Sequence, residues 1–446
     1  MEDMIFYDRL QFAFTITFHY MFPQLTMGLS LLIVYLKGKY LLNNIEKYND
    51  AAKFLMKIFA VNFTIGIVTG IPMEFQFGTN WAKFSELTGG IIGQTLAMEG
   101  TFSFFLESSF LVLFLFGEKR MSKRMHFLMG FLVFLGSWAS GWFILATNAW
   151  MQNPVGYEIL ESGKFVISDF GAIFTNPWLL PAFLHNQIAA LTTSSFVMAS
   201  IGAFYILRKK HVEYGKLFLK TGVIFGFVSS VLLAMPTGDW NAKNVAKYQP
   251  AAFAAMEGIF ETEEGGAEIV LIGQPNMVEE KLDNKIAVPN ILSFLTYQDW
   301  DTEIPGMDQF TEEELPDNIP ALYYSYHIMV GLGTIFIAVM GLAVFFLRKK
   351  KLYSIKSLLW AIMFLFPFPY IANITGWYTA ELGRQPFLVY GLLKTADGVS
   401  PTVSSGNTLF TLLGFVGIYI LLGFLFLLLV GKVIHEGPKP LTSKTH

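Results

Sequence analysis

The chain of 446 residues contains no cysteine. This absence excludes disulfide bonds, cysteine-ligated zinc, iron–sulfur clusters and thiol catalysis within the chain. It leaves open a haem or flavin held by other side chains. Any metal must therefore be bound by histidine, methionine or carboxylate groups.

Charge is also scarce, because only 15% of the residues are charged while 53% are hydrophobic and 16% aromatic. A water-soluble globule could not keep this much apolar surface away from solvent. The first apolar run follows the acidic start "MEDMIFYDRLQ", which has no basic n-region, and no small-residue cleavage site closes the run, so we expect it to be retained. The composition predicts an all-α, polytopic membrane helical bundle.

Several apolar runs reach the roughly 20 residues that cross a hydrocarbon core about 30 Å thick. Hydropathy predicts nine transmembrane helices, at residues 11–36, 54–73, 91–116, 125–148, 178–207, 217–236, 319–347, 357–379 and 406–431.

Lysine and arginine gather in alternate connections between these spans. The basic segments are 37–53, 117–124, 208–220 and 348–356, together with Lys432, Lys439 and Lys444 in the tail. The positive-inside rule places them on the cytoplasmic face, so we expect the C-terminus inside and the N-terminus outside. The segments 74–90, 149–177, 237–318 and 380–405 are then outside as well.

Segment 237–318 differs from the other connections because it carries half of the acidic residues of the chain. Loops longer than about 15 residues tend to be functional or disordered, and its aromatic residues and prolines favour a partly ordered, functional loop. We therefore divide the chain into helices 1–6 (residues 1–236), one long extracytoplasmic loop (237–318) and helices 7–9 (319–446).

Three of the seven histidines, His19, His185 and His327, lie inside apolar spans. One such histidine can simply form a hydrogen bond between helices, but three together favour a functional role. The predicted orientation brings His19 about 12–15 Å into the bilayer from outside, at 1.5 Å per residue. His185 and Met329 fall in the same outer half, as does Glu99, and the eighth span ends outside at Glu381.

Imidazole, thioether and carboxylate groups at one level are a suitable set of axial haem ligands. A histidine with a methionine fills both axial positions of a low-spin haem, whereas a single histidine or glutamate leaves a position open for oxygen. Met329 alone is weak evidence, since most of the 19 methionines must simply fill space.

Two acids in the third span, Glu99 and Glu107, are eight residues apart and project from nearly the same helix face. With Ser108 and Ser140 they could form a proton relay, or each acid could be paired with polar groups of a neighbouring helix. At the end of the eighth span, Glu381 could be a ligand with Arg384 neutralising a propionate, or the two could form an i,i+3 salt bridge. The Gln385-Pro386 step should stop this helix.

Six segments together resemble subunit I of the cytochrome bd-type quinol oxidases, over about residues 5–435. They are "RLQFAFTITFHYMFPQLTMGL", "MEFQFGTNW", "AMEGTFSFFLESSF", "NAWMQNPVGY", "ALYYSYHIMVGLG" and "GWYTAELGRQPF". The resemblance implies a terminal oxidase of the bacterial cytoplasmic membrane that oxidises a membrane quinol and reduces dioxygen to water. It also implies a second membrane subunit (subunit II), allows small single-span subunits, and gives no role to nucleic acid.

The resemblance further implies three haems in this chain. His185 and Met329 would hold a low-spin haem b, while His19 and Glu381 would each hold one of two high-spin haems, a haem b and a haem d, in an order left open. It assigns Glu99 to a place beside the high-spin pair, Glu107 and Ser140 to a proton path from the cytoplasm, and Trp377 to a place between haems. The loop 237–318 would be a short quinol-binding loop in which Glu257 serves quinol oxidation.

Two positions depart from the family pattern: Ala252 replaces a lysine before Glu257, and His327 replaces an arginine before Met329. Both changes should alter the electrostatics around the quinol site and the low-spin haem. Two other functions use similar residues: a cofactor-free ion-coupled transporter, and a haem b electron-transfer subunit without oxygen chemistry. The sequence shows no internal repeat of the kind on which many transporters are built.

Overall fold

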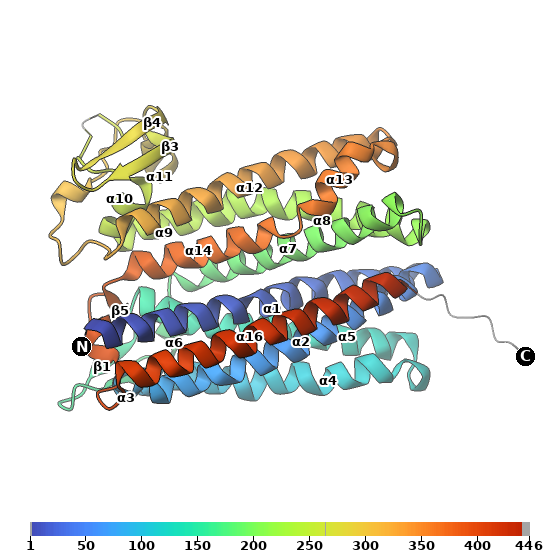
Figure 1. The fold of residues 1–446 in the computed structure, drawn as a ribbon, viewed down its shortest axis with the longest axis horizontal. Helices are drawn as coiled ribbons and strands as arrows, with labels where there is room; N and C mark the ends of the chain where they lie inside the picture. The colour runs from blue at the N-terminus through green and yellow to red at the C-terminus, as the bar shows by residue number, and fades with distance from the viewer. Residues whose placement is uncertain (1, 264, 439–446) are drawn as a thin grey trace, which may run out of the picture.

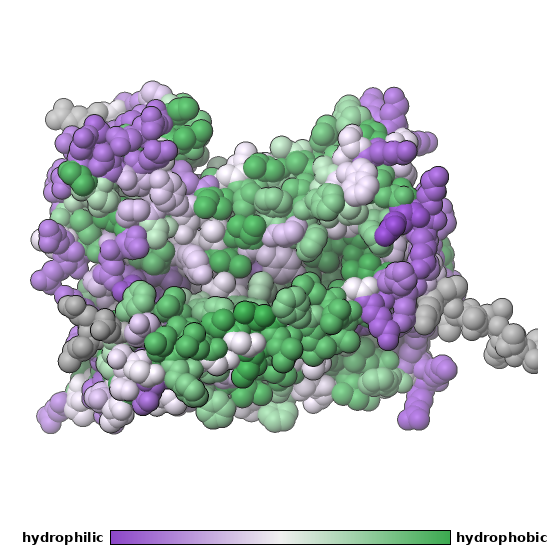
Figure 2. Space-filling model, viewed as in Figure 1, coloured by the Kyte–Doolittle hydropathy of each residue, from purple (hydrophilic) through white to green (hydrophobic). Residues whose placement is uncertain are grey.

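The computed structural model describes residues 2–263 and 265–438, so Lys439 and Lys444 of the basic tail lie outside the described residues. Nine helical segments of the described chain are long and apolar enough to cross a membrane, which confirms the predicted bundle. They lie side by side in Figure 1. In Figure 2 hydrophilic residues gather at the two ends of the bundle and hydrophobic residues form a belt between them.

The first five spans use the following elements. They are α1 (Glu2–Asn43), α2 (Glu46–Thr79), α3 (Ala82–Met98) with the π-helical turn η1 (Glu99–Phe104) and α4 (Phe105–Phe116), α5 (Lys123–Gln152), and α7 (Leu179–Leu207). The short 3₁₀ turn η2 (Glu118–Arg120), the hairpin β1 (Tyr157–Ile159) and β2 (Phe165–Ile167), and α6 (Phe170–Phe174) lie in the connections.

The last four spans are assembled from more pieces. They are α8 (Val212–Leu232) with the π-helical turn η3 (Leu233–Gly238) and α9 (Asp239–Tyr248), α12 (Ile319–Arg348), α13 (Lys356–Phe364) with α14 (Phe368–Arg384), and α16 (Ser405–Glu436). The turn η5 (Leu352–Ser354), the strands β5 (Phe387–Val389) and β6 (Leu393–Lys394), and α15 (Thr395–Gly398) connect them.

The helices extend beyond the predicted apolar runs, because a helix continues to satisfy its backbone hydrogen bonds after its side chains become polar. The sixth span is the largest case: it was expected to end at residue 236, but it continues through η3 and α9 to Tyr248. The eighth span is broken between Phe364 and Phe368, at Pro367, which has no N–H to donate. Helix α14 ends at Arg384, as the Gln385-Pro386 step predicted.

Small residues let the central helices approach closely. A Cβ added at Gly28 of α1 would lie 2.2 Å from the carbonyl oxygen of Ala190 in α7, and one at Gly222 of α8 would lie 2.5 Å from that of Ser195. Such contacts between backbones stabilise helix pairs in membranes, where burial of apolar surface gives little driving force. They fix α1, α7 and α8 as the frame on which the candidate site is built.

Residues 249–318 form a separate lobe at the end of the bundle that also holds the N-terminus (Figure 1). The lobe contains α10 (Pro250–Glu257), the antiparallel hairpin of β3 (Ile269–Asn276) and β4 (Lys281–Val288), α11 (Ile291–Tyr297) and the turn η4 (Met307–Gln309). Its apolar core includes Phe253, Met256, Leu292 and Leu322, the last of which belongs to α12. The lobe is therefore packed on the transmembrane helices rather than tethered to them.

Candidate functional site

The ring of His19 is held by a threonine on the neighbouring helix. His19 Nδ1 lies 3.1 Å from Thr69 Oγ1, and the Thr69 hydroxyl is itself within 3.0 Å of the Ile65 and Gly66 carbonyl oxygens. Because the hydroxyl donates its one proton to a carbonyl, the ring nitrogen must be the donor in the first bond. Nε2 of a neutral His19 then keeps its lone pair, as an axial iron ligand requires.

His185 of α7 is held in the same way. Its Nδ1 lies 3.2 Å from Thr237 Oγ1, and that hydroxyl lies 3.0 Å from the Leu232 carbonyl oxygen, so the ring again donates from Nδ1. The π-helical turn η3, which contains Pro236, supplies Thr237. The distortion of the sixth span therefore has a local consequence, since it places a hydroxyl against the candidate ligand.

A single hydrogen bond sets the two histidines at one level. Tyr20, which follows His19, donates to Asn186 Oδ1 at 2.6 Å, and Asn186 follows His185. The Tyr20 ring also packs edge to face on Trp377 of α14, with 5.6 Å between ring centroids. The structure thus joins α1 and α7 one residue away from His19 and His185, and Trp377 brings α14 against the same tyrosine.

Met329 of α12 joins this level through Gly376, the neighbour of Trp377. A Cβ at Gly376 would lie 2.8 Å from the Met329 sulfur, so only glycine lets the thioether lie against α14 in this way. A Cβ at Gly70 would similarly lie 2.9 Å from Cε1 of His19. Glycine at both positions leaves room beside a candidate ligand.

Glu381 lies one turn beyond Trp377 on α14, and both of its oxygens are engaged. Asn148 Nδ2 of α5 donates to Oε1 at 2.8 Å, and the Arg384 guanidinium bonds Oε2 closely. The i,i+3 salt bridge left open from the sequence is therefore present. Arg384 is only 3% exposed and its Nε is without a partner among the described residues.

The two acids of the third span both face α5. Ser140 donates to Glu99 Oε1 at 2.6 Å, whereas Glu107, only 5% exposed, keeps Oε1 without a partner in the described part of the chain. A Cβ at Gly136 would lie 2.8 Å from the Glu107 backbone nitrogen, so α5 lies close against the third span there. Ser140 is thus joined to Glu99 and not to Glu107, with which the sequence had grouped it.

Glu257 ends α10 inside the lobe and is 2% exposed. Its hydrogen-bond partner is Tyr326 of α12, whose hydroxyl donates to Oε1 at 2.6 Å. Burial raises the pKa of the Glu257 carboxyl to about 7, and the bond from Tyr326 lowers it in part. The sequence did not point to Tyr326, because a tyrosine in an aromatic span carries no local signal. Its place three residues before Met329 is the one clue.

The two positions that depart from the expected pattern, Ala252 and His327, lie on α10 and α12, the helices that carry Glu257 and Tyr326. Ala252 is 3% exposed and packs toward Gly383 of α14, so no charge replaces the usual lysine. His327 directs Nδ1 to the Tyr323 carbonyl oxygen at 2.9 Å, and its ring stacks on that of Tyr323 with 3.9 Å between centroids. Glu257 is therefore held by a neutral phenol.

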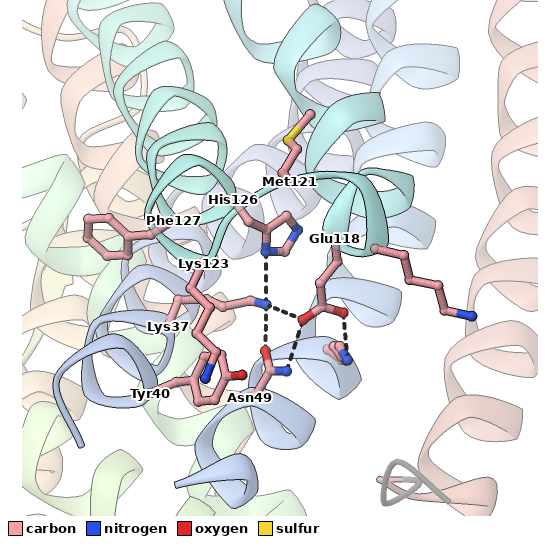
Figure 3. Close-up of a pocket in the computed structure, with 10 residues that line it drawn as sticks. Lys37, Tyr40, Asn49, Glu118, Met121, Lys123, His126 and Phe127 are labelled. Atoms are coloured by element: carbon pink, nitrogen blue, oxygen red, sulfur yellow. Dashed lines mark hydrogen bonds and ion pairs between the residues drawn. The ribbon is translucent and has the colours of Figure 1, made fainter. Parts of the chain in front are cut away.

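A second polar cluster lies at the opposite end of the bundle and was missed by the sequence analysis. It lines a cavity of about 340 Å³ (Figure 3). Lys37, 3% exposed, bonds to Asn49 Oδ1 at 2.6 Å, His126 Nδ1 at 3.1 Å and Glu118 Oε1 at 3.3 Å. Lys53 pairs with the other Glu118 oxygen at 2.5 Å. No apolar periodicity could have revealed it, because its members come from four separate segments.

The donor set around His19 and His185 fits haem. Within residues 2–263 and 265–438, no three His, Asp or Glu side chains gather as they would around a bare metal ion. Single histidines, each with a threonine hydroxyl bonded to Nδ1, suit an iron that brings four nitrogen ligands of its own. Glu381 fits less directly, because its oxygens are already bound to Asn148 and Arg384.

Comparisons with known proteins relate the chain to one family. The family model "Cytochrome bd terminal oxidase subunit I" matches residues 7–438. Cytochrome bd ubiquinol oxidase subunit 1 of Bacillus subtilis is 37% identical, covering 96% of this chain and 93% of that protein. Cytochrome bd-II ubiquinol oxidase subunit 1 of Escherichia coli is 29% identical, over 100% and 99% of the two chains. The solved structure of bd oxidase from Geobacillus thermodenitrificans matches with a TM-score of 0.91 and 29% identity, over 98% and 99%.

Proposed function

Because the chain belongs to the family of cytochrome bd terminal oxidase subunit I and is part of a quinol:oxygen oxidoreductase, we propose that it is the haem-carrying subunit. In this proposal it lies in the bacterial cytoplasmic membrane beside a subunit II, with its N-terminus outside. The observation that carries the proposal is the Tyr20–Asn186 hydrogen bond, which sets His19 and His185 at one level, each with a threonine on Nδ1.

His185 and Met329 would hold a low-spin haem b, and His19 and Glu381 the two high-spin haems, one of them haem d. When bound, the haems supply electron transfer and the reduction of dioxygen to water. The role of Glu381 requires that it share its carboxylate, since Asn148 and Arg384 already bind it. Trp377 would lie between haems, where its contact with Tyr20 keeps it in place.

Glu257 would accept a proton from quinol bound at the lobe. A carboxyl whose pKa lies near 7 can take up and release a proton at neutral pH, which suits a general base. Tyr326 holds the carboxyl by its hydroxyl, and it lies three residues from Met329 on the same helix face. The proton acceptor and the candidate ligand of the low-spin haem are thus linked through one turn of α12. The released protons would leave on the outer side.

Protons for water formation would come from the cytoplasmic side through Glu107 and Glu99. Among the described residues, Oε1 of Glu107 has no hydrogen-bond partner, so it can bind a proton or a water without breaking an existing bond. Ser140 orients the Glu99 carboxyl by donating to Oε1. Taking protons from one face and releasing them at the other is what would generate a proton motive force.

An optical spectrum of the purified oxidase tests the proposal. We expect mixed low-spin and high-spin haem bands together with a far-red chlorin absorption. Low-spin haem b alone would support an electron-transfer subunit instead, and the absence of a Soret band would support a cofactor-free transporter. Quinol-driven oxygen uptake by the same preparation is the matching activity.

A further inference from the structure

The base of the β3–β4 hairpin carries an apolar surface that the oxidase assignment does not use. Four aliphatic side chains there are exposed, although the lobe as a whole is acidic: Leu271 at 57%, Ile272 at 58%, Ile286 at 56% and Val288 at 36%. We call these four residues the hairpin base. Exposed aliphatic residues scattered singly are common, but a contiguous group on two paired strands calls for a partner.

Strand pairing puts most of these residues on one face. Ile272 is the register partner of Ile286, and Val288 lies two residues further along β4, so these side chains share a face. The opposite face is the one that packs on α12, because Val270 is 8% exposed and a Cβ at Gly273 would lie 2.7 Å from the Tyr323 hydroxyl. The hairpin base therefore points away from the bundle.

The hairpin base also lies at the level of a transmembrane helix. The backbone of Val270 lies beside the His327 ring, eight residues into α12 and thus about 12 Å along it. On the outer side of α12, Tyr324 and Ile328 are each 44% exposed within a span that crosses the membrane. The hairpin is thus packed on α12 at a level where that helix exposes Tyr324 and Ile328.

The charged side chains of the hairpin are exposed at its tip and paired near its base, as expected if the base meets the membrane edge. The tip carries Glu279 and Lys281, and Val278 there is 92% exposed. Near the base, the single lysine, Lys285, is paired with Glu268 and lies 3.9 Å from Glu263. In Figure 2 the edge of the lobe toward the apolar belt is hydrophobic, and the far edge is hydrophilic.

We propose that the hairpin base, Leu271, Ile272, Ile286 and Val288, lies in the edge of the lipid bilayer and anchors the lobe of residues 249–318 to the membrane surface. The lipid acyl chains cover the aliphatic side chains, while the charged tip stays in water. Such an anchor lies in the interface without spanning the membrane. The proposal does not depend on the haem assignment.

The absence of cysteine gives a direct test, since one introduced cysteine is a unique labelling site in this chain. Ile286→Cys and, as a matched control on the same hairpin, Val278→Cys would be spin-labelled in the complete oxidase complex in phospholipid nanodiscs. Wild-type complex treated with the same label gives the background from any companion subunit. Relaxation by dissolved oxygen, which concentrates in lipid, is compared with relaxation by a water-soluble nickel chelate.

We expect oxygen to relax the label at position 286 several-fold more than the nickel chelate does, and the reverse at position 278. Equal exposure of both labels to the nickel chelate would overturn the proposal, because the hairpin base would then be in water. Protection of position 286 from both agents would also overturn it, because a protein would then cover the surface. Val288→Cys repeats the test if Ile286→Cys does not fold, and the thermal unfolding profile shows which variants are intact.

Discussion

The two polar clusters of the bundle differ in how completely their hydrogen bonds are made. At the basic end, the Lys37 ammonium has three acceptors, and Glu118 receives Lys37, Lys53 and Asn49. At the other end, Nδ1 is the ring nitrogen of His19 and of His185 that bonds to a described side chain, and the fully buried Gln187, two residues after His185, has neither amide atom bonded within the described residues.

This difference helps to separate structural polar clusters from functional ones. Buried polar groups are nearly always hydrogen-bonded, so a complete cluster stabilises the fold, and each incomplete group needs an explanation. Among the described residues, three of the incomplete groups, on Gln187, His327 and Arg384, lie within three residues of a candidate ligand, whereas others, such as that on His211, do not. We therefore expect substitutions at that end to change activity, and substitutions at the basic end to change stability.

His185→Ala should have the largest effect. Loss of the imidazole removes a candidate axial ligand, so we expect the low-spin haem band to disappear and quinol-driven oxygen uptake to fall about 100-fold. The measurement is the reduced-minus-oxidised spectrum together with oxygen uptake. His435→Ala, on the exposed end of α16, is the control and should leave both unchanged. A normal low-spin band in His185→Ala would remove this ligand from the proposal.

Glu107→Gln should have the next largest effect. The amide keeps the shape of the side chain but cannot carry a proton, so turnover should fall about 100-fold while all haem bands remain. Glu86→Gln, on the exposed face of the same span, is the matched control. Unchanged turnover in Glu107→Gln would take this acid off the proton path.

The sequence predicts the spans and the single residues of the candidate site, but not the contacts between distant segments. Apolar run length predicted the nine spans, and the single histidines at His19 and His185 stood out because an ionisable group inside a span is costly. The threonines that orient them were not predictable, because Thr237 reaches His185 only through the π-helical turn at Pro236. The cluster around Lys37 was not predictable either, since Asn49, Glu118 and His126 meet only in three dimensions.

At the basic end, the comparison can be tested through Glu118 and the stability of the protein in acid. Partial burial alone would raise the pKa of the Glu118 carboxyl above its ordinary value of 4.5. Hydrogen bonds from Lys53 and Asn49 and the charge of Lys37 instead lower this pKa to about 2. A lowered carboxyl pKa gives stability that is present above pH 4.5 and is lost as the pH falls toward 2. Glu118→Gln should therefore cost about 2 kcal/mol of unfolding free energy at neutral pH and flatten the decline below pH 4.5.

Thermal unfolding of the wild type and Glu118→Gln between pH 3 and pH 7 measures this effect. Glu213→Gln, an exposed acid in the neighbouring basic connection, is the control. If Glu118→Gln instead lowered turnover of the intact oxidase more than its stability, the basic cluster would take part in chemistry and the comparison would fail.

Tyr326→Phe should have the smallest effect on activity, a shift of its pH profile. The hydroxyl bond lowers the pKa of Glu257, so its loss should raise that pKa above about 7. If Glu257 must be ionised to accept the quinol proton, the acidic limb of kcat/KM should move to higher pH, by about one pH unit, with haem bands unchanged. Tyr324→Phe, on the exposed side of the same helix turn, should leave the profile in place. Equal profiles for Tyr326→Phe and the wild type would show that the bond to Glu257 serves packing alone, because a purely structural contact changes stability without moving a titration.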